Sequence, residues 1–368
     1  MTKSRLFYID NLRIFLISLV VLHHFNISYG GPGSWYYNES EAGFPEIIPQ
    51  AMFNITNQAF FMGMFFFISA FFTAASVGRK STGKFLNDRL IRLGIPLVVF
   101  YFILNPLTIF IVNKFILKND ITYSGLLINT EAWGFGPMWF VEALLIFTVI
   151  YLLIRKFILK VRLKFPGTLS LFVSAIVIGV IQFFIRIWLP VGWSQPFTGF
   201  QFPFFIQYIF LFAFGIIAFQ NNWLNAISFK TAKRYFLFAQ AMILIVLPLL
   251  LYFGGRGKGI ENFVGGVTWQ SFSWAVWEQL VGFSLITGLL GIFKKYFDGQ
   301  GKLACNLSAS AYGVFILHPP LIVLVSAVFV SWQIPQLLKF MILAPLALMF
   351  CFLVAGLIRK IPLLREIL

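Results

Sequence analysis

Charged residues are scarce in this sequence. Asp, Glu, Lys and Arg make up 11% of the 368 residues, whereas a soluble domain carries about 25%. Hydrophobic residues make up 60%, and the mean hydropathy is +0.88. This balance excludes a soluble globular protein and predicts an all-α, polytopic membrane helix bundle.

Cysteine, histidine and acidic residues are also few. The two cysteines, Cys305 and Cys351, lie in a short loop and in an apolar segment, so no disulfide framework is predicted. We predict no metal site and no permanently bound cofactor. The 12 acidic residues leave a net charge of +16, which in a soluble protein would suggest a nucleic-acid partner. Here membrane topology explains the charge, and no nucleic-acid partner is expected.

The apolar sequence divides into ten segments of about the length that a bilayer requires. Lys3 and Arg5 precede the first segment as in a signal peptide, but no small-x-small cleavage site follows, so we expect a retained first helix. We predict one membrane domain over residues 1–368, with spans at 12–29, 53–77, 94–113, 137–154, 169–188, 203–220, 235–253, 270–293, 309–330 and 336–358.

The basic residues alternate between the loops in the way that this count requires. With the N-terminus inside, the cytoplasmic segments hold 21 basic residues, and the outer loops hold only Lys114, Lys118, Arg256 and Lys258. Cytoplasmic loops of membrane proteins are enriched in Lys and Arg. The pattern therefore predicts ten helices with both termini in the cytoplasm.

The first segment holds an arginine and a histidine on one helix face. Arg13 and His24 are 11 residues apart, which is about 16 Å along the axis and within about 20° around it. An ionisable residue within a membrane is a functional hypothesis by default. The alternative is a core histidine bonded to a neighbouring helix. His23 points about 100° away from His24 and is a secondary candidate.

Two further arginines lie at the start of the third segment. Arg89 and Arg92 are three residues apart, which predicts one helix face at the cytoplasmic surface. Guanidinium groups bind phosphate oxygens in pairs. The alternative is a plain topological signal.

Glu142 lies five residues after Pro137, and His24 lies five residues before Tyr29. Both are predicted about 8 Å below the outer surface, where the carboxylate would hold the imidazole. The alternative is an isolated, protonated Glu142 bonded to a backbone carbonyl.

Three more polar residues lie within predicted spans. Two of them, Glu278 and His318, are predicted near the midplane, and His318 is followed by Pro319 and Pro320. Each has two possible roles, a structural contact between helices or a part in the chemistry. Arg186 is near an outer end, and we expect it to snorkel towards the surface.

Five sequence blocks resemble the acyltransferase-3 family of integral membrane acyltransferases. The opening YIDNLRIFLISLVVLHH matches its spacing of Arg and His, followed by FFFISAFF, RLIR, MWFVEALL and SAYGVFILHPPL in the family's order. Ala70 departs from the usual glycine, so Ser69 is assigned no role. The YIDNLR opening looks closest to the branch that modifies periplasmic glucans, including by succinylation.

The resemblance implies an O-acyltransferase in a bacterial inner (cytoplasmic) membrane. An acetyl or succinyl group would pass from cytoplasmic acyl-CoA, as cosubstrate, to a hydroxyl of an extracytoplasmic glycan, with the lipid bilayer and other polysaccharide-assembly proteins as partners. Arg13, Arg89 and Arg92 would bind the CoA phosphates. His24 would act as general base or carry the acyl group itself, and Glu142 would orient it.

Two other classes of function fit parts of the sequence. A proton-coupled transporter also uses intramembrane His and Glu, although we find no internal repeat of the kind many transporters have. A scaffold for polysaccharide assembly needs no catalysis. Neither explains inner-surface arginines together with an outer-half histidine.

The charge pattern makes a prediction about topology. Reporter fusions after Lys80, Lys164, Arg234 and Lys302 should report the cytoplasm, because their loops carry the excess of basic residues. Fusions near Glu41, Gly199 and Arg256 should report the outside. An external signal from the loop at residues 155–164 would contradict the ten-helix topology.

Overall fold

The computed structural model describes residues 5–158, 162–255 and 261–367, and throughout these ranges the chain forms helices and loops without strands. Within these ranges, ten helices are long and apolar enough to cross a membrane. The predicted loop charges Lys3, Lys160, Arg256 and Lys258 lie outside the described residues. The all-α, ten-helix prediction is confirmed.

Each candidate span overlaps one predicted segment. The spans are α1 (Phe7–Ser28), α2 (Ile47–Val77), α3 to η3 (Thr82–Ile116), η5 with α7 (Gly136–Phe157), α8 (Thr168–Trp188), α9 (Phe202–Gln220), α11 to α12 (Phe229–Gly254), α14 (Trp269–Tyr296), α15 (Lys302–Val328) and α16 (Gln336–Ile358). Shorter helices lie between or after them: α6 (Tyr123–Ile128), α10 (Trp223–Ala226), α13 (Glu261–Val264) and α17 (Pro362–Ile367).

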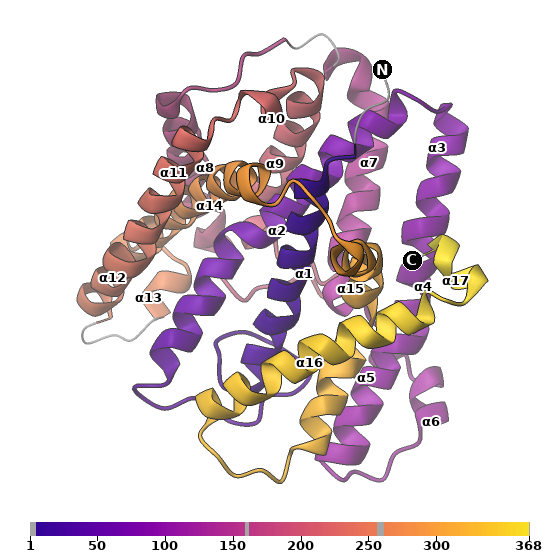
Figure 1. Ribbon diagram of the computed structural model, residues 1–368. Coiled ribbons are helices and arrows are strands. Elements are labelled where there is room, and N and C mark those ends of the chain that lie inside the picture. Colours follow the sequence, from indigo (N-terminus) through magenta and orange to yellow (C-terminus); the bar gives the residue numbers. More distant parts are fainter. Residues whose placement is uncertain (1–4, 159–161, 256–260, 368) are drawn as a thin grey trace.

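Helix α1 runs through the middle of the bundle (Figure 1, dark indigo). It packs against α2, α14, α15 and α16. Its side chains at Leu12, Leu16, Val20 and Phe25 are fully buried. A helix that is hydrophobic all round belongs in the interior. The central position lets α1 offer Arg13 and His24 to several neighbouring helices.

The third span alternates between α-helical and π-helical turns. Its parts are α3 (Thr82–Arg89), η1 (Leu90–Gly94), α4 (Ile95–Val99), η2 (Phe100–Leu104), α5 (Asn105–Ile111) and η3 (Val112–Ile116). Pro96 and Pro106 each lie two residues after a π turn, and Pro248 of α12 (Leu247–Gly254) likewise follows η6 (Met242–Val246). Proline removes a helix hydrogen bond and crowds the preceding turn, and a wider turn relieves this crowding.

Contacts at the two ends of the bundle agree with the predicted alternation. At the end of the bundle where α1 begins, the N-terminal end, Asn11 donates to the carbonyl of Phe297 at 2.7 Å, and Trp223 donates to the carbonyl of Leu163 at 2.9 Å. At the opposite end, the amide of Val191 donates to Val264 at 2.7 Å. Loops predicted on one side of the membrane thus meet each other. Which end faces the cytoplasm stays a prediction.

A buried ion pair joins α8 and α14. Arg186 Nη2 lies 2.7 Å from Glu278 Oε2, and both side chains are almost completely buried. Gln182 donates to the same oxygen at 3.0 Å, and the Arg186 guanidinium lies over the Phe204 ring. The prediction that Arg186 snorkels to the surface is therefore wrong. Glu278 offers it a partner inside the bundle, where an unpaired charge would be costly.

This pair generates a prediction about stability. Arg186→Met should lower the free energy of unfolding by about 3–5 kcal/mol, because it leaves the Glu278 carboxylate buried and unpaired. Arg186→Met combined with Glu278→Leu should recover most of this loss, because no buried charge remains. Thermal unfolding of the detergent-purified variants measures both effects, with Lys295→Met at an exposed position as control. A double variant as unstable as the single one would contradict the prediction.

Candidate active site

Two histidines meet in the interior. His24 Nδ1, near the end of α1, lies 3.1 Å from Nε2 of His318 in α15, and the rings stack at 5.1 Å between centroids. His318 Nδ1 lies 2.7 Å from the carbonyl oxygen of Phe315. His318 is fully buried, whereas His24 is partly exposed. The pair therefore has one anchored member and one accessible member.

The sequence of α15 explains the anchor. A helical carbonyl normally accepts from the amide four residues later. For Phe315 that residue is Pro319, which has no N–H. The helix continues through Pro319 and Pro320, so the Phe315 carbonyl is left for another donor. The imidazole of His318 takes that place.

The indole of Trp35 covers the histidine pair. Its ring centroid lies 4.0 Å from that of His24 at an interplanar angle of 17°, and 5.8 Å from that of His318. Trp35 belongs to the loop between α1 and α2, at the opposite end of the bundle. Its indole nitrogen, Nε1, is buried and has no hydrogen-bond partner in the described structure. A buried polar group without a partner in the protein is expected to bind water or a substrate.

Polar contacts hold this loop against the bundle. Tyr36 donates its hydroxyl to Asn105 of α5, whose amide donates to the Ala132 carbonyl at 2.8 Å. Burial raises the pKa of the Tyr36 hydroxyl, so this hydroxyl remains protonated and can donate. The buried ammonium of Lys339, in α16, donates to both carboxylate oxygens of Glu39, at 2.8 Å each. These contacts fix Trp35 from two sides.

The three predicted arginines gather at the N-terminal end of the bundle. Arg13 lies 3.5 Å from Asp10 and is partly exposed. Its guanidinium is close enough to Arg92 for their charges to repel, and Arg89 is likewise close to Arg92. Arg13 and Arg89 are partly exposed and Arg92 is exposed, and a cluster of like charges open to solvent in this way suits an anion that neutralises it.

Helix α15 also contacts the arginine cluster. The Tyr312 hydroxyl donates to the backbone carbonyl of Arg92 at 2.9 Å. Arg89 ends α3 and donates to Thr73 at 2.9 Å, whereas Arg92 lies in the π turn η1 and is exposed. The side chains thus have different surroundings, although the sequence spacing predicts a shared face.

The predicted pairing of Glu142 with His24 is not formed. His24 bonds to His318 instead, and Glu142 Oε2 is buried with no hydrogen-bond partner in the described structure. Helix α7 (Trp139–Ile158) approaches the site through Phe140, whose ring packs on Phe315 at 5.8 Å. Matching depth predicted that the two groups could meet, but depth does not determine which helices are neighbours.

The remaining candidates have other partners. The His23 ring packs against Phe61 of α2 at 5.1 Å, in keeping with a direction different from that of His24. Glu278 pairs with Arg186 in the α8–α14 network. Among the described residues, no group of three or more His, Cys, Asp or Glu side chains is placed to hold a metal ion.

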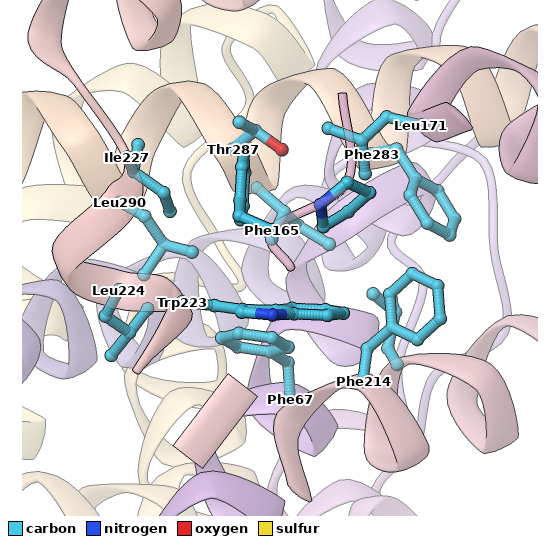
Figure 2. A pocket seen from close by; sticks show the side chains of 13 residues that line it. Phe67, Phe165, Leu171, Phe214, Trp223, Leu224, Ile227, Phe283, Thr287 and Leu290 are labelled. Atoms are coloured by element: carbon cyan, nitrogen blue, oxygen red, sulfur yellow. The ribbon is translucent and has the colours of Figure 1, made fainter. Parts of the chain in front are cut away.

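Two hollows lie away from the histidine pair. An apolar cavity of about 40 Å³ lies among aromatic and aliphatic side chains that include Phe67, Phe214 and Trp223 (Figure 2). It is too small for an acyl-CoA. A groove of about 420 Å³ runs between α1, α15 and α16, and Ile14 and Ser18 contribute to it from α1. These residues lie about 100–140° around α1 from Arg13, so the groove is on another face.

Sequence reasoning missed Trp35, the Phe315 carbonyl and Tyr312 as parts of the site. Trp35 stands in the aromatic run WYY of the first loop, where tryptophan and tyrosine are ordinarily interface anchors. The signal for the carbonyl was present, because Pro319 four residues later removes its helix donor.

Comparisons with known proteins agree with the five sequence blocks. The acyltransferase-3 family model, described as an acyltransferase domain, matches residues 6–358. Glucans biosynthesis protein C of Escherichia coli O1:K1 is 23% identical over 334 residues, which cover 86% of this chain and 82% of that protein. The proteins of that name from E. coli K12 and Shigella dysenteriae serotype 1 are 22% identical with the same coverage.

No solved structure matches the chain. The family match covers nearly the whole sequence, and it decides between the three classes of function in favour of acyl transfer. The chain belongs to the acyltransferase-3 family and is a membrane acyltransferase.

Proposed function

We propose that this acyltransferase moves an acetyl or succinyl group from cytoplasmic acyl-CoA to a hydroxyl of an extracytoplasmic glycan in a bacterial inner membrane. The main support is the layout of α1. The guanidinium cluster around Arg13 and the histidine pair at His24 are about 16 Å apart along one helix face. Acyl-CoA is likewise a long molecule, with phosphates at one end and the thioester at the other.

The arginines are the proposed site for the CoA phosphates. The guanidinium of Arg92 makes no hydrogen bond or ion pair with the described residues, and Arg13 has one carboxylate neighbour, Asp10, at 3.5 Å. Both therefore keep N–H groups for oxyanions. The cytoplasmic location of this end is supported by the 21 basic residues on this side against four on the other.

His24 is the proposed general base. A ring nitrogen takes the proton of the acceptor hydroxyl, and the oxygen of that hydroxyl attacks the carbonyl carbon of the thioester. The carbon–sulfur bond then breaks, and CoA leaves as the thiol with the proton that the imidazolium returns. Positioned proton transfer of this kind contributes about 10²–10⁴-fold to a rate. Trp35 shields the pair from water at the acceptor end.

The acceptor is proposed as a glucan or a related polysaccharide. This choice is supported by the curated relatives, which are named glucans biosynthesis proteins. The loop that carries Trp35 lies at the end where such an acceptor would enter. The unpartnered Trp35 nitrogen and Glu142 Oε2 are polar groups that a sugar with many hydroxyls could satisfy.

The donor site generates a prediction. Replacing Arg89 and Arg92 together with Gln should weaken acetyl-CoA binding roughly tenfold or more, because charge-assisted contacts to phosphate are worth about 1.5–3 kcal/mol each. Lys at both positions should restore only part of the affinity, because an ammonium cannot form two parallel hydrogen bonds. Calorimetric titration of the purified protein measures the affinity.

The control for this experiment is a second pair of exposed basic residues at the same end. Lys84→Gln with Lys233→Gln removes the same net charge without touching the cluster. Equal acetyl-CoA affinity in the arginine variant and the wild type would contradict the proposed phosphate site. These arginines would then serve only to set the membrane topology.

The chemistry generates a separate prediction. His24→Ala should abolish acyl transfer and retain acyl-CoA binding, whereas Arg13→Ala should weaken binding, because the two residues meet opposite ends of the donor. His23→Ala is the matched control and should be milder, since its ring faces Phe61. Acylation of glycans by membranes, measured by mass spectrometry alongside CoA binding, separates the effects. Transfer at the wild-type rate by His24→Ala would refute the assignment.

A further inference from the structure

The hydrogen bonds around His318 determine where its proton lies. A backbone carbonyl can only accept a hydrogen bond. His318 Nδ1 is 2.7 Å from the Phe315 carbonyl, so this nitrogen must carry a hydrogen and donate it. Pro319 strengthens the requirement, because it removes the amide that would otherwise satisfy this carbonyl.

The position of the proton on His318 also determines the position of the proton on His24. A neutral imidazole has one donor nitrogen and one acceptor nitrogen, so Nε2 of His318 is an acceptor. Its partner at 3.1 Å is Nδ1 of His24, which must then be the donor. In a neutral His24 the lone pair therefore resides on Nε2. A charged His318 would avoid this assignment, but it would be an unpaired charge in a fully buried position.

We infer that His318 is a positioning residue that holds His24 in the tautomer with its hydrogen on Nδ1 and its lone pair on Nε2. Only this tautomer presents Nε2 as the nitrogen that takes the proton from an acceptor hydroxyl. The catalytic meaning of the inference rests on the proposed function, in which His24 is the general base.

The same hydrogen bond persists during transfer. When Nε2 takes the proton, the ring becomes an imidazolium, and its Nδ1–H still donates to His318 Nε2. No proton has to pass through His318. The Phe315 carbonyl keeps the His318 ring in place, and the stacked Trp35 indole restricts the rotation of both rings. The arrangement thus orients the base and provides an acceptor for it in both of its charge states.

The composition of the chain makes the tautomers directly measurable. It contains three histidines, His23, His24 and His318, so ¹⁵N-histidine labelling gives a spectrum of only six ring nitrogens. Nitrogen chemical shifts distinguish a protonated from an unprotonated ring nitrogen, and spectra of His23→Phe and His24→Phe assign the signals. We expect the wild-type protein in detergent micelles to show His24 and His318 with the hydrogen on Nδ1.

Two substitutions test the role of His318. In His318→Gln the side-chain amide oxygen keeps an acceptor for His24, whereas His318→Phe keeps a planar ring of similar size without one. In His318→Phe, His24 should populate both tautomers, and kcat should fall about 10²-fold with an unchanged KM for the acyl donor. In His318→Gln, the Nδ1–H tautomer and most of kcat should be retained.

Each outcome decides the matter. A wild-type His24 with its hydrogen on Nε2 would overturn the inference, and this measurement needs no variant. So would a His24 tautomer that is unchanged in His318→Phe, or equal loss of kcat in the Phe and Gln variants. Failure of the proposed function looks different, because wild-type membranes would then acylate no glycan while the tautomers remained as inferred.

Discussion

The hydrocarbon core of a bilayer offers no hydrogen-bond partner, so an ionisable side chain inside this bundle is costly unless another part of the chain supplies one. Three pairs follow from that constraint. His24 bonds to His318, Arg186 to Glu278, and Lys339 to Glu39. They connect α1 with α15, α8 with α14, and the first loop with α16. Only the first pair consists of two imidazoles, which can both take up and release a proton near neutral pH, and this distinguishes the candidate site from the two ion pairs.

The ten spans were predictable because they depend on local properties. Bilayer thickness sets a minimum length of apolar sequence, and basic residues mark alternate loops. Both can be counted along the chain without knowing which helices touch. For the same reason the shared face of Arg13 and His24 was predictable, since it follows from the period of a single helix.

Partners on different helices were not predictable in this way. Depth placed Glu142 level with His24, but α1 and α15 bring His318 to the imidazole instead. Arg186 was expected to reach the surface, because nothing in one sequence identifies Glu278, 92 residues away, as its neighbour. The π turns had a local cause in Pro96 and Pro106, yet their effect on Arg92 depends on how the third span packs.

The sequence separation of these contacts also sets an order in time. The partner of Glu39 is 300 residues later, and that of His24 is 294 residues later. At about 5–20 residues per second, translation needs some tens of seconds to cover such a distance. During that interval α1 and the loop after it are already made, but His318 and Lys339, the partners of His24 and Glu39, have not yet been synthesised. The proposed site, which needs His318, therefore stays incomplete until α15 (Lys302–Val328) has been made.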